Sequence, residues 1–147
     1  MRLACPKPDP FTAALKQTMR MHFVRVSACL LALTALTATA QADDAGEQSF
    51  KKCLACHAIG EGAKNKVGPL LNGLAGRKSG TIEGYAYSDA NKNSGLTWDE
   101  ATFKSYIKNP REKIPGTKMV FAGIKSEQEI NALWTYISSF GADGKKK

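Results

Sequence analysis

The sequence is poor in the residues that most often bind metals or carry redox chemistry, with four cysteines and two histidines in 147 residues. It also lacks any run of eighteen or more apolar residues, which argues against a standard membrane-spanning helix. A hydrophobic share of 43% and a charged share of 23% exclude disorder or a fibrous repeat as the main state. The length suits one domain, or one domain and a processed leader. The positions of the few cysteines and histidines therefore decide the function.

The N-terminal part of the chain has the three regions of a secretory signal peptide. Two arginines precede the apolar stretch VSACLLALTALTATA, residues 26–40, and a small-residue site of the A-x-A type ends at Ala42. A buried core helix is the alternative, but four serines and threonines interrupt the stretch without forming a polar face. We therefore expect residues 1–42 to be a leader that is cleaved after Ala42, and residues 43–147 to be the mature domain.

The predicted leader changes what the composition means. Residues 1–18 are an unusual proline-rich extension, so a start at Met19 or Met21 would give a more usual signal peptide. Removing residues 1–42 leaves 16 Lys and Arg against 12 Asp and Glu, so half of the formal net charge of +8 is lost with the leader. A charge near +4 without interleaved aromatic residues gives little reason to expect a nucleic-acid partner. The cysteines and the histidine that stay are close neighbours: Cys53, Cys56 and His57.

Helical signals flank the middle of the mature chain. Residues 43–56 begin with acidic residues and have Lys51-Lys52 near their end, an order that the helix dipole favours. The segment 97–100, TWDE, predicts a capping box for a helix that runs to Lys108 and is stopped by Asn109-Pro110. A second capping box, SEQE, precedes apolar residues at helical spacing: Ile130, Leu133, Trp134, Ile137 and Phe140.

The stretch between these helices, residues 58–96, is rich in glycine and in turn signals. We expect it to be mostly loop, with a short helix near residues 88–93, and residues 115–119 to form a second loop. No strand pattern competes, so the predicted class is all-α, with three main helices, short ones and long loops. Loops of this length in a small domain need something to pack around, and a large apolar cofactor would supply it.

Cys53-Leu54-Ala55-Cys56-His57 is a C-x-x-C-H motif, the attachment motif of c-type haem. Two thiols on one helical turn can each add to one haem vinyl group, and the histidine is then carried to the face of the iron. Three other interpretations exist. Structural zinc needs four ligands and residues 43–147 offer three; a thioredoxin-like pair needs a βαβ context; and a plain disulfide needs no histidine. Haem attachment also takes place in compartments reached by export, which agrees with the leader.

A second iron ligand must come from another residue type, because residues 43–147 contain no further histidine. Methionine, lysine, tyrosine or the N-terminal amine could serve, and Met119 is the single methionine of this part of the chain. The alternative role for Met119 is to fill a gap in the core. Methionine–histidine ligation raises the reduction potential and leaves no open position on the iron, which favours electron transfer over catalysis.

These residues resemble class I cytochrome c, of the medium-length type that mitochondria share with the cytochromes c2 of alphaproteobacteria. The resemblance runs from about Gly46 to Phe140 and implies the cytochrome c fold around one covalent haem c. The matching segments are CLACH (53–57), VGPLLNGLAGRKSG (67–80), YSDANKN (87–93), residues 96–110 and IPGTKMVFAGIK (114–125). The leader is foreign to the mitochondrial members, which are imported without a cleaved presequence, so a bacterial periplasm is expected.

The resemblance also implies roles for single residues. His57 and Met119 would be the axial ligands, with the Pro69 carbonyl accepting a hydrogen bond from the other ring nitrogen of the histidine. Tyr106 and Thr117 would lie near the methionine. The haem propionates would be served, directly or through water, by Arg77, Tyr87, Asn91 and Trp98. Where the terminal helices cross, the expected contacts join Gly46, Phe50, Trp134 and Tyr136.

Five lysines flank the segments that would ring the exposed haem edge: Lys51, Lys52, Lys66, Lys118 and Lys125. An ordinary solvated surface is the alternative for each one, but together they would steer the protein toward acidic docking faces. We expect a soluble, monomeric electron carrier, not an enzyme, between a cytochrome bc1-type complex and a terminal oxidase, reaction centre or reductase. The alternatives are a haem peroxidase or gas-binding protein with a labile sixth ligand, and a cytochrome tethered by a retained leader. The tail, residues 141–147, has no motif and is expected to be solvated.

Overall fold

The computed structural model describes residues 37–147, and their side chains from Asp43 onward, so most of the predicted leader lies outside the described residues. The helices of this part are α2 (Thr37–Phe50), α3 (Asp89–Lys92), α4 (Glu100–Lys108), α5 (Pro110–Lys113) and α6 (Glu127–Ser138). The same part contains no strand, only isolated bridges that pair Lys78 with Thr97 and Phe140 with Lys146. The predicted all-α class is therefore confirmed. None of the described helices is long and apolar enough to cross a membrane.

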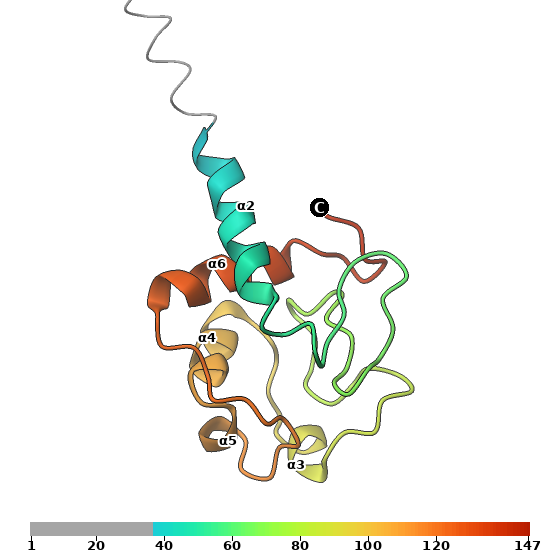
Figure 1. Cartoon of the computed structure of the whole chain (residues 1–147). Coiled ribbons are helices and arrows are strands. Elements are labelled where there is room, and N and C mark those ends of the chain that lie inside the picture. The colour runs from blue at the N-terminus through green and yellow to red at the C-terminus, as the bar shows by residue number, and fades with distance from the viewer. Residues whose placement is uncertain (1–36) are drawn as a thin grey trace, which may run out of the picture. The chain divides into compact units, whose positions relative to one another are not determined.

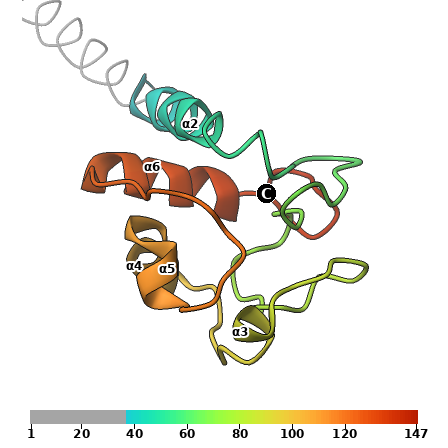
Figure 2. The ribbon, with the colours of Figure 1, turned by 60° about the horizontal axis from the view of Figure 1, so that its bottom comes forward.

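The C-terminal half of α2 packs against α6, and α6 packs against α4 (Figures 1 and 2). Gly46 allows the close approach of α2, because a Cβ atom there would lie 2.6 Å from Tyr136 Cβ. One turn later, the Phe50 and Tyr136 rings pack with their centroids 5.5 Å apart. Tyr136 is thus the α6 residue that contacts both Gly46 and Phe50. The Trp134 ring instead packs on Phe103 of α4, with ring centroids 5.2 Å apart.

The boundaries of α2 differ from the prediction at both ends. The helix begins at Thr37, so Asp43 lies inside it rather than in its first turn. It ends at Phe50 rather than Cys56, because the backbone there changes to tighter bonds between residues three apart. The Cys53 N–H donates to the Phe50 carbonyl at 2.8 Å, and residues 51–56 form consecutive turns. The C-x-x-C-H motif therefore follows the helix on a series of tight turns.

The N-terminus of α6 is the one that was predicted. Ser126 is the N-cap, and its Oγ accepts a hydrogen bond from the Glu129 N–H at 3.3 Å. The Glu129 carboxylate in turn accepts from Ser49 Oγ at 2.9 Å and from Lys52 Nζ. A residue of the capping box therefore also ties α6 to the end of α2.

The N-cap of α4 is Asp99, and not Thr97 as the capping-box pattern suggested. The Asp99 carboxylate accepts from the Thr102 N–H at 2.7 Å, while Thr97 is in the bridge with Lys78. The backbone hydrogen bond lowers the pKa of the Asp99 carboxyl. The end of α4 at Lys108 agrees with the prediction, and Pro110 then opens α5, a short helix that was not expected.

The loops and the core follow the predicted division of the chain. Residues 58–96 are loop apart from α3, which lies inside the short helix expected near residues 88–93. The whole apolar stripe of the last helix is buried, and its partners come mainly from α4. The buried hydrophobic residues of these two helices, with Phe140 two residues after the end of α6, are Phe103, Tyr106, Ile107, Ile130, Leu133, Trp134, Tyr136, Ile137 and Phe140.

Most residues of the C-terminal tail, residues 141–147, are exposed as expected, but its backbone is folded back on the molecule, which was not expected. The Lys147 N–H donates to the Ser139 carbonyl at 2.8 Å, and Lys146 pairs with Phe140 in an isolated bridge. The ammonium of Lys146 lies 5.3 Å from the centre of the Tyr136 ring, within cation–π range. Gly144 is buried, although the charged side chains around it are exposed.

Candidate functional site

A cavity of about 380 Å³ lies between the loop of residues 58–96, the loop of residues 114–126 and the inner faces of α4 and α6. This volume falls within the ~300–1,000 Å³ that is typical of pockets for cofactors and small molecules. Every residue that was predicted to hold the iron or the cofactor lines it: Cys53, Cys56, His57, Pro69, Arg77, Tyr87, Asn91, Trp98, Tyr106, Thr117 and Met119. Residues that are far apart in the sequence are thus brought to one site.

The apolar wall of this cavity was not predicted from the sequence. That wall includes Leu71, Leu74, Phe103, Ile107, Leu133 and Ile137. Leu133 and Ile137 were named only as members of an apolar stripe at helical spacing, and their separation by four residues places them on one helical face. The signal was therefore present, but the periodicity of a helix does not distinguish a face that touches another helix from a face that touches a ligand.

The two cysteines of the motif form no disulfide and differ in exposure. Cys53 is partly buried, and this burial raises the pKa of its thiol to about 11. Cys56 is exposed. Both thiols line the cavity, so each is available to a ligand inside it. Nowhere in the described part of the chain do three or more His, Cys, Asp or Glu side chains gather in a way that could hold a metal ion.

Two neighbouring residues, Gly68 and Pro69, orient the His57 ring. Its Nδ1 atom lies 2.7 Å from the Pro69 carbonyl oxygen, which can only accept, so Nδ1 carries the proton and Nε2 keeps its lone pair. Burial lowers the pKa of His57, and the bond to Pro69 opposes this effect. Gly68 packs on the ring, because a Cβ atom there would overlap His57 Cε1 and lie 2.8 Å from Nε2. The imidazole is therefore neutral and held in the tautomer that binds metals through Nε2.

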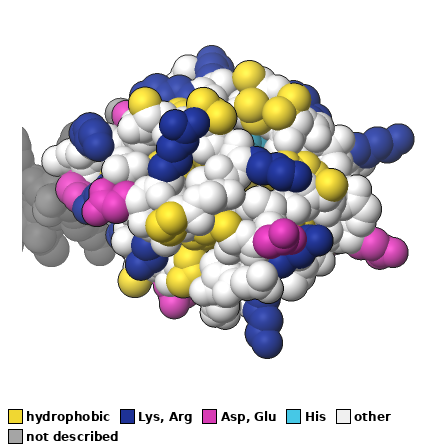
Figure 3. Space-filling model, turned by 90° about the horizontal axis from the view of Figure 1, so that it is seen from below, with side chains coloured by type: hydrophobic (Ala, Val, Ile, Leu, Met, Phe, Trp, Pro, Cys, Tyr) yellow, Lys and Arg dark blue, Asp and Glu magenta, His cyan; other side chains and the backbone are white. Residues whose placement is uncertain are grey.

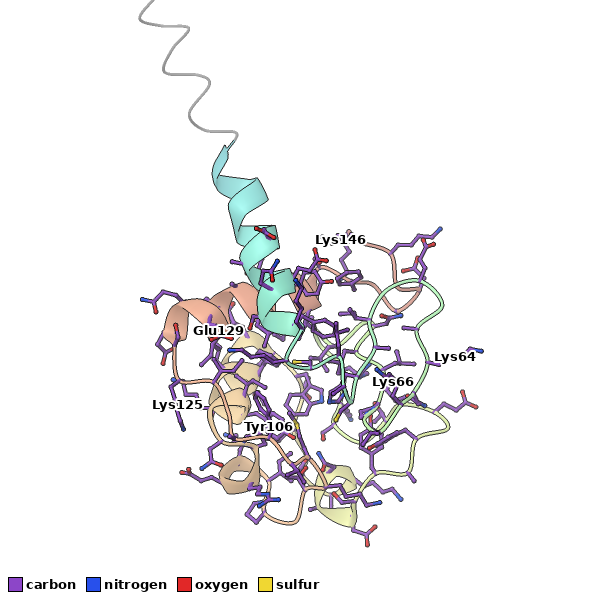
Figure 4. The ribbon with its side chains drawn as sticks, in the orientation of Figure 1. Lys64, Lys66, Tyr106, Lys125, Glu129 and Lys146 are labelled. Carbon is purple, nitrogen blue, oxygen red and sulfur yellow. The ribbon has the colours of Figure 1, made fainter. Side chains whose placement is uncertain are left out.

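Met119 is held from two sides. Tyr106 donates its hydroxyl to Met119 Sδ at 3.1 Å, and the Met119 N–H donates to Thr117 Oγ1 at 3.3 Å. Burial raises the pKa of Tyr106, so the phenol stays protonated as a donor. The Tyr106 ring is fixed in turn by Trp98, with centroids 4.9 Å apart and planes at 69°. Figure 4 shows Tyr106 reaching from α4 into the interior of the body.

Residues 114–126, between α5 and α6, form the Met119 loop. Asn91, which is buried, joins this loop to the loop that contains α3. Its side-chain oxygen accepts from Thr117 Oγ1 at 2.8 Å and from Ser88 Oγ at 2.9 Å. Its backbone carbonyl accepts from Ser79 Oγ at 3.0 Å. Asn91 therefore fixes the position of both loops at the wall of the cavity.

Arg77 has a polar atom that its surroundings leave unpaired. Its Nη1 donates to the Asn72 carbonyl at 2.7 Å and its Nη2 to the Leu70 carbonyl at 3.3 Å. Its Nε is buried without a hydrogen-bond partner, the one such side-chain atom in the described part of the chain. Burial lowers the pKa of Arg77, and burial also raises the pKa of the neighbouring Tyr87 hydroxyl. A buried donor of this kind requires an acceptor, and an anionic group in the cavity would supply one.

The five lysines differ in their surroundings, and four of them donate hydrogen bonds. Two of the five, Lys52 and Lys118, line the cavity. Lys118 Nζ donates to the Ala86 carbonyl at 3.1 Å, which connects the Met119 loop to the opposite loop. Lys125 Nζ donates to the Lys108 carbonyl at 3.2 Å. Lys66 donates to the Leu54 carbonyl, and Lys52 pairs with Glu129. Lys51 is exposed.

Large apolar side chains are exposed beside these lysines. Val67 and Val120 line the cavity and are 76% and 80% exposed, and Leu54, within the C-x-x-C-H motif, is 47% exposed. Figure 3 shows hydrophobic and basic side chains intermixed on one face of the described body. A cavity mouth with apolar residues at its edge and lysines around it has the composition of a docking surface.

The donor set of the cavity fits a haem c. Two thiols can form thioethers, a neutral imidazole and a thioether sulfur can bind iron, and the apolar wall suits the porphyrin. The unpaired Arg77 Nε fits a propionate, since a carboxylate accepts from a guanidinium.

Comparison with known proteins gives the same assignment. The family model described as cytochrome c matches residues 44–141. The chain is 77% identical over 103 residues to cytochrome c-550 of Bradyrhizobium diazoefficiens, covering 70% of this chain and 76% of that protein. It is 72% identical over 104 residues to a cytochrome c2 of Rhodoplanes tepidamans, covering 71% and 97%. Among solved structures, cytochrome cH from Methylobacterium extorquens matches with a TM-score of 0.60 and 46% identity, covering 64% of this chain and 94% of that one.

The matched residues contain the C-x-x-C-H motif, the Met119 loop and the helices that line the cavity. They therefore confirm the predicted cytochrome c fold and the resemblance from which it was expected. The chain belongs to the cytochrome c family, as a class I c-type cytochrome of the bacterial c2 type, an electron carrier with one covalently attached haem c.

Proposed function

We propose that Cys53 and Cys56 attach the haem through thioether bonds and that His57 and Met119 are its axial ligands. One observation carries this proposal: His57 and Met119 line the same cavity, and each is held by a hydrogen bond at a specific atom. The Pro69 carbonyl directs the Nε2 lone pair of the histidine, and the Tyr106 hydroxyl holds the methionine sulfur. When bound, the haem supplies a one-electron couple between Fe(III) and Fe(II).

The remaining predicted residues act on the edge of the cofactor. Arg77 and Trp98 would donate to the propionates, with Tyr87 and Asn91 contributing directly or through water. The unpaired Nε of Arg77 supports this assignment, because a carboxylate in the cavity would satisfy a buried donor. The apolar wall excludes water from the iron and keeps the local dielectric low, which adjusts the reduction potential.

The role is electron transfer rather than an enzymatic reaction. A peroxidase or gas-binding haem protein needs a position on the iron that opens readily. Here Tyr106 and Thr117 both hold the Met119 segment, which favours a closed sixth position.

The partners are proposed to be acidic docking faces, with a cytochrome bc1-type complex on one side and a terminal oxidase, reaction centre or reductase on the other. Lys52 and Lys118 at the cavity, with Lys51, Lys66 and Lys125, would steer the approach, and exposed Val67 and Val120 would form the apolar centre. The protein would act as a soluble monomer without a nucleic-acid partner, and its association rate should fall as ionic strength rises.

The proposed location is the periplasm, reached after cleavage behind Ala42. The leader pattern supports this, and so does the export that haem attachment requires. N-terminal sequencing of the protein purified from a bacterial periplasm should find Asp43 first. A chain that keeps the apolar stretch, residues 26–40, would favour the tethered form instead.

The test of the ligand assignment is an optical spectrum of the oxidised protein in the far red, with a spectrum of the reduced protein beside it. We expect a weak methionine-to-iron charge-transfer band that Met119→Ala abolishes and that Val120→Ala, one residue further in the same exposed loop, retains. A wild-type protein without this band, and with ready binding of carbon monoxide to its reduced form, would have an open iron. The ligand-binding or peroxidase alternative would then replace electron transfer.

A further inference from the structure

The C-terminal tail, residues 141–147, has no role in the proposed function, but it touches the segment that positions Arg77. Gly144 of the tail is buried, with φ at +83°. A Cβ atom at this position would overlap the Gly60 carbonyl oxygen and lie 2.8 Å from Asn72 Nδ2. The backbone of the tail is therefore seated directly on the place where Gly60 and Asn72 meet.

Gly60 and Asn72 are joined by a pair of hydrogen bonds. The Gly60 N–H donates to Asn72 Oδ1 at 2.8 Å, and Asn72 Nδ2 donates to the Gly60 carbonyl at 2.9 Å. The Asn72 backbone carbonyl is also the nearer of the two acceptors of Arg77, at 2.7 Å from Nη1. Asn72 thus contacts the tail through its side chain and the Arg77 guanidinium through its backbone carbonyl.

The tail is braced well enough to hold this position. The Gly141 N–H donates to the Lys145 carbonyl at 2.8 Å, and the Gly144 N–H donates to the Gly141 carbonyl at 3.1 Å. The Gly73 N–H, next to Asn72, donates to the Phe140 carbonyl at 3.2 Å. Figure 4 shows Lys146 on this tail, beyond the end of α6. The tail, the Gly60 turn and the Asn72 turn therefore form one hydrogen-bonded unit.

We propose that the tail is a positioning element for Arg77. Its Gly144 backbone holds the Gly60–Asn72 pair, and this pair fixes the guanidinium at the cavity with Nε directed to an acceptor that the protein itself does not provide. The inference rests on the proposed role of Arg77 toward the haem propionates. It adds that the tail, which lies outside the cavity, controls the position of Arg77 and thereby the reduction potential of the haem.

The expected direction follows from electrostatics. A positive charge near the iron stabilises the Fe(II) state, which carries one positive charge fewer than Fe(III). If the guanidinium moves away from the propionates, they are less neutralised and Fe(III) is favoured. Displacing the tail should therefore lower the reduction potential, although no atom of the tail lines the cavity.

The test compares Gly144→Ala with Gly95→Ala in the haem-loaded protein. Both positions have positive φ, so both variants carry a similar backbone strain, but a Cβ atom at Gly95 meets nothing within 4 Å. We expect Gly144→Ala to lower the reduction potential and to speed hydrogen exchange of the Gly60 amide. Gly95→Ala should leave both at their wild-type values. If Gly144→Ala does not fold, a chain that ends at Gly141 removes the same contact. Its control is Lys145→Ala/Lys146→Ala/Lys147→Ala, which removes the lysine charges of the tail and keeps the Gly144 backbone.

Arg77→Gln separates this inference from the proposed function. If Arg77→Gln and Gly144→Ala each lower the potential and the double variant is no lower than Arg77→Gln, the tail acts through Arg77. If Arg77→Gln lowers the potential but Gly144→Ala does not, or if the two effects add, the positioning role is overturned and the role of Arg77 stands. If Arg77→Gln leaves the potential unchanged, the proposed role of Arg77 fails and the inference fails with it.

Discussion

Helix α6 and the loop of residues 58–96 line the same cavity but are stabilised in different ways. α6 is held by apolar burial: Ile130 and Leu133 are fully buried, and Ser126 caps its N-terminus. The loop has few buried apolar side chains and is held by asparagine side chains. The amides of Asn65 and Asn72 bond to the backbone, and the Asn91 side-chain oxygen accepts from the Ser88 and Thr117 hydroxyls.

The difference shows how a small chain can order a long loop without making it a helix or a strand. Asn65 accepts from the Leu70 N–H at 3.0 Å and donates to the Glu83 carbonyl at 3.1 Å, so one amide joins three parts of the loop. Such bonds satisfy the backbone, but they contribute little hydrophobic free energy. Order in the loop should therefore depend on the cofactor more strongly than order in the helix does.

Loss of the haem is expected to have the largest effect, and it tests whether the helices are independent of the cavity. An empty apolar cavity of about 380 Å³, at ~24 cal/mol per Å³, would cost about 9 kcal/mol, which is comparable to the ~5–15 kcal/mol stability of a whole domain. Both α4 and α6 line this cavity. The variant Cys53→Ala/Cys56→Ala, prepared without haem, should therefore lack cooperative unfolding and most of its helical circular dichroism.

The wild-type holoprotein, prepared in parallel, is the control for that measurement. Native helix content with a cooperative urea transition in the haem-free variant would show that the helices form a stable unit by themselves. The loop would then be the only region that needs the cofactor, and the contrast between the two regions would be sharper than we expect.

Ile130→Ala is expected to have the next largest effect. It removes buried apolar contacts of α6 and leaves the cavity wall unchanged. Ile130 has 0% of its surface exposed and does not line the cavity. Truncation of a fully buried isoleucine costs about 2–5 kcal/mol, which urea unfolding of the holoprotein should show as a lower midpoint. The methionine-to-iron band should be retained in the folded protein. Gln128→Ala, exposed on the same helix, should change the stability by about 0.5 kcal/mol or less.

The same contrast explains which features could be predicted from the sequence. The stripe from Ile130 to Phe140 has the period of a helix, and Ser126 is a strong cap, so α6 was predicted closely. The cofactor residues were found because the C-x-x-C-H motif and the family resemblance name them. The end of α2 at Phe50 was missed because apolar and charged residues continue past it, and nothing local marks the change to tighter turns.

Features that depend on contacts between distant segments were the hardest to predict. The tail was expected to be solvated because residues 141–147 are glycine, alanine and charged residues, which carry no packing signal of their own. Its folded position comes from backbone contacts with Gly60 and Gly73, which no periodicity records. The unpaired Nε of Arg77 likewise follows only from where Asn72 and Leu70 lie in space.

Tyr106→Phe has a smaller effect and tests how firmly the Met119 loop closes the site. It removes one hydrogen bond to the methionine sulfur, worth about 0.5–1.5 kcal/mol, and leaves the ring packing with Trp98 in place. Added imidazole should replace the methionine faster in the oxidised variant than in the wild type, as a spectrum followed over time would show. Tyr85→Phe is the matched control, because its hydroxyl bonds to the Val67 carbonyl. Equal rates in both variants would contradict a specific role of Tyr106.

The smallest expected effect is that of the Glu129 contact, a polar connection between helix α6 and the end of α2. The Glu129 carboxylate joins α6 to Ser49 and Lys52, and the bond from Lys52 lowers the pKa of Glu129 below its ordinary value of about 4.5. A depressed pKa means that the contact stabilises the fold above pH 4.5 and that this contribution is lost as the pH falls through the folded-state value. Because Lys52 is half exposed, the effect should be about 1 kcal/mol or less.

The measurement is the difference in unfolding free energy between wild type and Glu129→Gln at pH 7 and at pH 3. The wild type should be more stable at pH 7, and the difference should shrink toward zero at pH 3 and in high salt, where the charge is neutralised or screened. Glu127→Gln, which removes a charge paired with Lys108 from the first turn of the same helix, controls for the general loss of a negative charge. A difference that persists at pH 3 would mean that the Glu129 side chain stabilises the helix crossing by packing and hydrogen bonding. The negative charge of Glu129 would then not be the cause of its stabilising effect.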